Sequence, residues 1–334
     1  MAGRWGITIP LEGLPLSEHR RILQEAEGIG YTDAWSAEVN GPDAFVPLAL
    51  AAAWTEKLRL GTAIANVFTR TPTLLAMSAA ALADAAPGRF CLGIGSSSPA
   101  IVERWNGVPL KQPVQRMHDT LAVLRQLLAG EKVSVSNGSF HLDGARLGRL
   151  PRPAPLIFVA ALREKMLRLA GGEADGVILN WLSAGDVTKV TPVAKEAAKA
   201  AGKDPDALEV ACRIFVIPTP DPSVARMMGR FIIAGYLTTP VYYPFHEWLG
   251  RGAALGPMMQ AWQAGERREA MALVPDEVID DIIVYGEPRQ IVDKVQAYCR
   301  NGVTVPILAI IPTSQDPKEQ AAQGIKAVQE LRPR

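Results

Sequence analysis

The segment LRLGTAIANV (residues 58–67) and the segment RFCLGIGSSS (residues 89–98) decide the fold of this 334-residue chain. Each is a run of β-branched and small apolar residues that ends in Asn, Gly or Ser, which is typical of a strand buried on both faces of a parallel sheet. The small residues at the strand ends allow another molecule to approach the backbone closely. Both segments are compatible with plain sheet core and with a flat ring bound at the strand ends.

Strand-like and helix-like segments alternate along the whole chain, as in a series of βα units. We expect eight strands, at residues 5–9, 33–38, 58–66, 90–95, 156–161, 176–182, 208–218 and 305–311. Eight strands with evenly placed helices favour a closed (β/α)8 TIM barrel over a doubly wound open sheet, which rarely has this many. The sequence therefore predicts a single TIM-barrel domain that covers residues 1–334.

Two segments depart from this alternation. Residues 131–150 are polar and contain glycine, which indicates a hairpin-like excursion from the barrel. Residues 221–285 predict a helical insertion between the seventh and eighth strands, without another clear strand. Its aromatic residues fit either a buried core or subunit interface, or a lid over the barrel mouth, where insertions set specificity. These aromatic residues are Phe231, Tyr236, Tyr242, Tyr243, Phe245, Trp248 and Trp262.

Composition excludes several classes of function. The 35 basic and 34 acidic residues nearly cancel, so no global charge would attract nucleic acid or a membrane surface. The chain has no secretion signal and no apolar run near the roughly 20 residues that span a bilayer, which predicts a cytoplasmic protein. Its three cysteines and four histidines are scattered, without the close spacing of metal ligands, so we expect no metal site.

Barrel enzymes place reacting groups at the carboxyl ends of the strands, so these positions indicate the chemistry. Here they are mostly small, amide or hydroxyl residues, and only Glu38 is acidic near the centre. Glycoside hydrolysis needs two facing carboxylates, and acyl transfer or Schiff-base chemistry needs a His or Lys that the site lacks. The residues at the strand ends therefore favour a cofactor that brings its own reactivity.

Five segments in register resemble the landmarks of the bacterial luciferase-like monooxygenase superfamily. They are YTDAWSAE (31–38), LGTAI (60–64), PGRFCLGIG (87–95), ADGV (174–177) and GEP (286–288). The segments VNGPD (39–43), SSS (96–98) and RWNG (104–107) look most like the branch that uses the deazaflavin coenzyme F420. This resemblance spans nearly the whole chain and implies an F420-dependent oxidoreductase.

The resemblance also implies a cofactor site. Members bind the tricyclic ring against a bulge in the third strand that contains a non-prolyl cis peptide, which maps to Ala63-Ile64. The cofactor phosphate maps to Ala161, Leu162 and Arg163, with Gly95, Ser96 and Ser97 on the neighbouring strand, where backbone N–H groups at a strand-to-helix turn favour an anion. Further ring or tail contacts that the resemblance suggests are Asn66, Asn106, Asn180 and Trp181.

Relatives that oxidise sugar phosphates carry a His and a Glu where this chain has Val39 and Ser98. The resemblance therefore favours hydride transfer from reduced F420 to a small organic substrate, with Glu38 or Asn40 orienting the ring or relaying a proton. A reduced-FMN-dependent monooxygenase of the same superfamily and a non-catalytic F420- or flavin-binding barrel stay open as alternatives. Relatives are commonly dimers, so we expect a homodimer, with the insertion helices as a possible interface.

Overall fold

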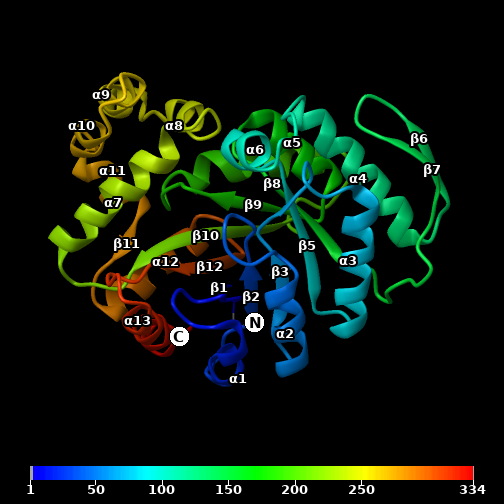
Figure 1. Cartoon of the computed structure of the whole chain (residues 1–334), viewed down its shortest axis with the longest axis horizontal. Coiled ribbons are helices and arrows are strands. Elements are labelled where there is room, and N and C mark those ends of the chain that lie inside the picture. Colours follow the sequence, from blue (N-terminus) through cyan, green and yellow to red (C-terminus); the bar gives the residue numbers. More distant parts are fainter. Residues whose placement is uncertain (1–2, 334) are drawn as a thin grey trace.

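A computed structural model describes residues 3–333 of the chain. Within these residues, eight parallel strands close into a barrel (Figure 1). The ring closes because β1 pairs with both β2 and β12, and β10 pairs with both β9 and β12. The barrel strands are β1 (Gly6–Ile9), β2 (Asp33–Ser36), β3 (Arg59–Thr62), β5 (Phe90–Gly95), β8 (Leu156–Ala160), β9 (Gly176–Asn180), β10 (Glu209–Ile217) and β12 (Val305–Ile310). The predicted TIM barrel is confirmed.

The long helices between the strands form the outer layer, and their apolar faces pack against the barrel. Their bounds are α1 (His19–Gly28), α2 (Val46–Trp54), α3 (Pro72–Ala85), α4 (Pro113–Ala129), α5 (Glu164–Glu173), α6 (Val187–Ala200), α12 (Pro288–Arg300) and α13 (Pro317–Glu330). Local signals fix several of the ends: the Thr71 side chain accepts from the Leu74 N–H, and Asp316 accepts from Lys318 and Glu319. A 3-10 turn, η1 (Leu16–Glu18), precedes α1.

The middle of the barrel is filled with side chains. Trp35 and Phe158 meet edge to face there, with ring centroids 5.6 Å apart. Glycine is required opposite the Trp35 ring, because a Cβ on Gly61 would lie 2.3 Å from it. A Cβ on Gly93 would lie 1.9 Å from the Thr62 carbonyl oxygen, so this position also excludes larger residues. A ligand can therefore enter only above this layer, at the carboxyl ends of the strands.

Two additions to the barrel lie on opposite sides of the molecule in Figure 1. The first is the antiparallel hairpin of β6 (Val133–Ser136) and β7 (His141–Ala145). The second is a group of helices between β10 and β12 with its own apolar core, which packs against Phe215 and Ile217 of β10. These helices are α7 (Pro222–Leu237), α8 (Tyr243–Leu249), α9 (Gly252–Gln263), α10 (Arg267–Ala272) and α11 (Asp276–Ile282).

This second segment contains one element that the sequence analysis missed. The two-residue strand β11 (Val284–Tyr285) pairs in parallel with Val216 and Ile217 of β10. Two residues are too few to produce a visible alternation of apolar and polar side chains, so this strand has no recognisable pattern in the sequence. The strand fastens the end of the insertion to the barrel.

Candidate functional site

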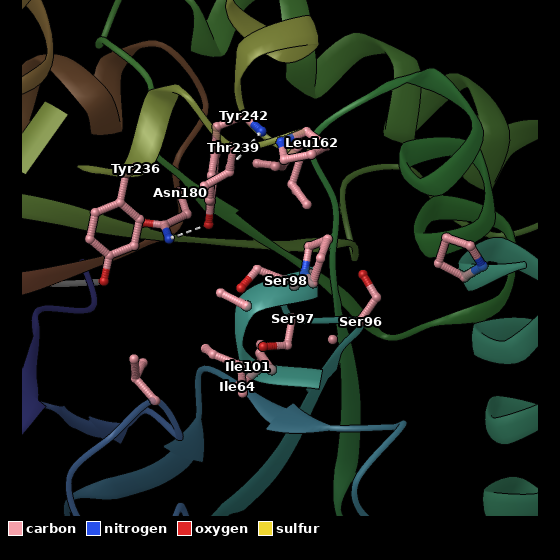
Figure 2. A pocket seen from close by; sticks show the side chains of 18 of the residues that line it. Ile64, Ser96, Ser97, Ser98, Ile101, Leu162, Asn180, Tyr236, Thr239 and Tyr242 are labelled. Carbon is pink, nitrogen blue, oxygen red and sulfur yellow. Dashed lines mark hydrogen bonds between the residues drawn. The ribbon is translucent and has the colours of Figure 1, made fainter. Parts of the chain in front are cut away.

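A cavity of about 1330 Å³ opens at the carboxyl ends of the barrel strands. Its walls come from the residues that follow β2, β3, β5, β8 and β9, and from the insertion helices α7 to α10 (Figure 2). Pockets for a single small ligand are typically about 300–1,000 Å³. The cavity therefore has room for a large cofactor together with a second molecule.

The third strand is interrupted at the wall of this cavity. β3 pairs with β5 through Leu60 and Gly61, the chain then bulges at Ala63 and Ile64, and β4 (Ala65–Asn66) resumes the pairing with β5. The peptide bond between Ala63 and Ile64 is cis, at the position that the family resemblance implied. Both residues line the cavity, and we refer to them as the ledge.

Gly95 of β5 lies beside the ledge and leaves room for the Ile64 side chain. A Cβ built on Gly95 would lie 2.7 Å from Cγ1 and 3.0 Å from Cδ1 of Ile64, and 3.3 Å from the Ala160 Cβ. The missing side chain at residue 95 thus makes space for Ile64 in its present position. Gly95 itself lines the cavity.

The segment after β5 adds hydroxyl groups to the wall. Ser96, Ser97 and Ser98 line the cavity, and Ser97 adopts a left-handed backbone conformation with φ of 58°. The carbonyl of Ser98 accepts from the N–H groups of Ile101 and Val102 and so starts a π-helical segment, η2 (Ala100–Trp105). Within residues 3–333 the three serine hydroxyls have no hydrogen-bond partner, so they are available to a ligand.

The amino terminus of α5 points toward the same cavity. Arg163 is the N-cap residue of this helix and offers no side-chain cap, and Leu162, Arg163 and Lys165 line the cavity. The first N–H groups of a helix lack partners within the helix, and the helix dipole places a partial positive charge there. Together with the exposed Arg163 and Lys165 side chains, this terminus is suited to an anion such as a phosphate.

The neighbouring strands β9 and β10 and the insertion add a polar wall made by Asn180, Arg213 and Tyr242. The Asn180 Nδ2 donates to the Tyr242 hydroxyl at 3.3 Å, as Figure 2 shows. Burial raises the pKa of Tyr242 to about 12, so its phenol keeps its proton at neutral pH. The Asn180 Oδ1 and the Arg213 Nε are both buried without a hydrogen-bond partner among the described residues.

Glu38 also lines the cavity, but its carboxylate is already engaged. The Arg70 Nη2 donates to it at 2.6 Å and the Arg70 Nε at 3.0 and 3.1 Å, and the Asn66 N–H adds a bond of 3.2 Å. These hydrogen bonds raise the pKa of the Arg70 guanidinium, which also contacts Asp43 at 3.0 Å. Glu38 is therefore placed to shape the wall and to position Asn66.

Most of the residues singled out from the sequence meet at this cavity. Those that line it are Glu38, Ala63, Ile64, Gly95, Ser96, Ser97, Ala161, Leu162, Arg163 and Asn180. Asn40, Asn66, Asn106 and Trp181 do not.

The structure gives a physical reason for these four exceptions. Asn40 and Asn106 are exposed, and Asn106 donates to the carbonyl of Ile101 in its own loop. Asn66 is buried behind the ledge, where its Oδ1 accepts from the Phe68 N–H. Trp181 has φ of 56° and is buried behind the cavity wall, where it stacks on Phe215 and on the cavity-lining Tyr236.

The aromatic residues of the insertion divide between the two roles expected for them. Phe245 is fully buried in the barrel core, and Tyr243 packs against the core of the insertion. The residues that line the cavity are Phe231, Tyr236, Tyr242, Trp248 and Trp262. The insertion is thus a cover of the cavity as well as a packed structural unit.

Sequence reasoning did not single out Arg213, although a signal for it was present. Arg213 interrupts an otherwise apolar strand, Val210 to Ile217, and a charged residue inside such a strand needs a partner or a solvated space. Arg213 follows Ala211 on the inward face of β10, and it lines the cavity. Burial lowers the pKa of its guanidinium.

Across residues 3–333 no group of three or more His, Cys, Asp or Glu side chains is arranged to hold a metal ion. None of the described helices combines the length and apolar character needed to cross a bilayer.

Comparisons with known proteins agree with this geometry. The family model described as luciferase-like monooxygenase matches residues 5–305. The 5,10-methylenetetrahydromethanopterin reductase of Archaeoglobus fulgidus is 29% identical over 306 residues, which cover 89% of this chain and 90% of that protein.

Two solved structures share the fold over nearly their whole length. The coenzyme F420-dependent tetrahydromethanopterin reductase of Methanopyrus kandleri has a TM-score of 0.79 at 24% identity, with 98% of each chain covered. An F420-dependent secondary alcohol dehydrogenase in complex with an F420-acetone adduct has a TM-score of 0.78 at 20% identity, with 99% of this chain and 100% of that chain covered.

Proposed function

This chain belongs to the luciferase-like monooxygenase family, and from that premise we propose that it is an F420-dependent oxidoreductase acting on a small organic substrate. The observation that carries the proposal is the presence of the ledge, Ala63 and Ile64, and the uncapped amino terminus of α5 in one cavity. A cofactor with a flat ring and an anionic tail needs both features in the same cavity, the ledge for the ring and the helix terminus for the tail. The names of the two F420-dependent relatives of like fold support the choice of coenzyme.

The residues present fit this coenzyme. The deazaflavin ring would rest on Ile64, where Gly95 leaves the space that a Cβ would fill. The phosphate would meet the first N–H groups of α5 and the side chains of Arg163 and Lys165. When bound, reduced F420 supplies a hydride from C5 of its ring. The protein supplies the binding, the orientation and the exclusion of water.

We further propose that the protein works as a reductase. The cavity wall offers no free carboxylate near Val39 or Ser98, where a base for alcohol oxidation would stand, because Glu38 is bound by Arg70. It does offer a proton donor, since the Tyr242 phenol stays protonated and accepts from Asn180, which leaves its own O–H free to donate. A donor without a free base suits the protonation of a reduced product.

The test is a titration of the purified chain with F420 in both redox states and with reduced FMN, followed by a screen of electron acceptors. We expect F420 binding with quenching of its fluorescence, and reoxidation of reduced F420 that depends on an acceptor. Binding of reduced FMN alone, with oxygen consumption, would identify the monooxygenase alternative. Binding of F420 without any acceptor-dependent reoxidation would identify a non-catalytic cofactor-binding protein.

We also propose a cytoplasmic homodimer. Large apolar side chains are exposed on two faces, Val46, Leu74 and Met77 on α2 and α3, and Met227 and Phe231 on α7 of the insertion. Light scattering after size exclusion measures the mass in solution. The variant Met227→Glu tests the insertion face, Met77→Glu tests the other face, and a monomeric wild-type protein would contradict the proposal.

A further inference from the structure

The cavity wall holds a cation, Arg213, that has no carboxylate partner within residues 3–333. Among the described residues Arg213 forms no ion pair within 4 Å, and its buried Nε–H has no acceptor. The titratable groups that act on it are Tyr236, Tyr242 and Cys212, and burial raises the pKa of both Tyr242 and Cys212, so these two give it no negative partner. Arginine stays protonated in proteins, so a full positive charge stands in the wall of a largely apolar cavity.

The other charged residues of the cavity lining add to this positive charge. Its two carboxylates are Glu38 and Glu164, and each is paired with an arginine outside the lining, Arg70 and Arg168. The remaining cations of the lining are Arg163, Lys165 and Arg267. The cavity lining therefore carries excess positive charge, which favours an anionic occupant.

Arg213 lies far around the barrel from the ledge. Around the barrel the strands follow the order β1, β2, β3, β5, β8, β9, β10, β12, so β10 stands four places from β3 in either direction. Arg213 therefore lies on the wall opposite the ledge, in register with Asn180 of β9. Its guanidinium is held over the Phe215 ring at 5.4 Å, which fixes its direction.

We infer that Arg213, Asn180 and Tyr242 form a subsite for the carboxylate of an organic-acid substrate. The guanidinium offers a planar fork of N–H donors that matches the two oxygens of a carboxylate. Figure 2 shows the hydrogen bond from Asn180 that places the Tyr242 hydroxyl, which borders this subsite. The aromatic side chains of Tyr236 and Trp248 provide apolar surface for the body of the acid.

This inference rests on the proposed function only in placing the coenzyme at the ledge, and its test needs no coenzyme. Calorimetric titrations measure the affinity of the cofactor-free protein for acetate, crotonate, benzoate and cinnamate, each paired with its neutral amide. We expect at least one acid to bind roughly tenfold or more tightly than its amide, because hydrogen bonds to charged groups are the strong ones. Arg213→Gln should remove that preference, and Arg213→Lys should keep part of it.

The matched control is Arg267→Gln. Arg267 is a second arginine of the lining, but its guanidinium donates to the Trp262 carbonyl and stacks on the Trp262 ring at 3.9 Å. We expect this variant to retain the preference for the acid to within about threefold, because it changes only long-range charge. Thermal melting checks that each variant is folded.

Three results would overturn the inference. In the first, no acid of the panel binds more tightly than its amide. In the second, Arg267→Gln and Arg213→Gln lose the preference for the acid equally. In the third, Arg213→Gln binds acids as before but loses affinity for reduced F420. A wild-type chain that binds acids through Arg213 but binds no F420 would instead refute the proposed coenzyme and leave the subsite standing.

Discussion

The contact between Gly95 and Ile64 allows a direct test of the ledge. The variant Gly95→Ala adds a methyl group that would lie 2.7 Å from Cγ1 and 3.0 Å from Cδ1 of Ile64. Ordinary contacts between carbon atoms are about 3.5–4.0 Å, so Ile64 must move by roughly 1 Å, because the new Cβ is anchored to the buried strand β5.

The size of the effect follows from the cost of overpacking. Inserting one methyl group into a packed site typically costs about 1–3 kcal/mol. If a bound ring requires Ile64 in its present position, the same cost is subtracted from binding, which raises the Kd for F420 by roughly 5- to 150-fold. The free energy of unfolding falls by no more than this amount, since Ile64 is only partly buried and can move toward the cavity.

Fluorescence titration with F420 measures the affinity, and the matched control is Gly235→Ala. Gly235 also lines the cavity, but a Cβ there has no atom within 4 Å, so its affinity should be unchanged. A double-mutant cycle isolates the contact: after Ile64→Ala, which removes the clashing atoms, Gly95→Ala should cost little more. An equal cost of Gly95→Ala in both backgrounds, or no cost in the wild type, would refute the role of the ledge.

Three further perturbations test neighbouring parts of the structure. Burial lowers the pKa of His246 to about 4, below its unfolded value near 6.5, so its contribution to stability is fully present above pH 6.5 and is lost as the pH falls toward 4. In urea unfolding, the stability difference between wild type and His246→Gln should therefore shrink by about 3 kcal/mol over that range, and a constant difference would contradict it. Glu38→Gln should lower the free energy of unfolding by about 1–3 kcal/mol in the same assay, because it weakens the hydrogen-bonded pair with Arg70; an unchanged value would show that the pair is not structural. Arg163→Gln and Lys165→Gln should each weaken F420 binding by roughly two- to fivefold at low salt and by less at high salt. Neither variant should change the affinity for the deazaflavin riboside, which lacks the phosphate. Equal losses of affinity for both ligands would show that the phosphate does not bind at this helix end.

The fold could be predicted because its signals are local. Each barrel strand is a short apolar run bounded by Gly, Pro or polar residues, and the ledge region 60–64 is among the segments that resemble the superfamily. The residues of the cavity wall at Gly95 and at Leu162 to Arg163 could be placed for the same reason, since they directly follow strands whose carboxyl ends share one rim.

The remaining side chains depended on geometry that a sequence does not carry. Asn180 and Trp181 are neighbours in the chain, but Asn180 lines the cavity, whereas the Trp181 ring is buried behind the wall and stacks at 4.0 Å on Phe215. Asn106 belongs to a loop whose conformation is set by its own hydrogen bonds. The charge of Arg213 within an apolar strand was a signal, but only the pleat and register of β10 show that this side chain faces inward.

A second arginine inside the barrel, Arg59, shows how this fold compensates a buried positive charge, and Arg213 differs from it. Arg59 of β3 lies at the amino end of the barrel, where its Nε donates to Asp33 at 2.6 Å and its Nη1 to Glu209 at 2.8 Å. Arg59 is almost completely buried, and the fold supplies two carboxylates to compensate its charge. At the carboxyl end the same barrel leaves the charge of Arg213 without a carboxylate. Since barrel enzymes keep stabilising groups at the amino end and reacting groups at the carboxyl end, the missing partner of Arg213 is best supplied by a ligand.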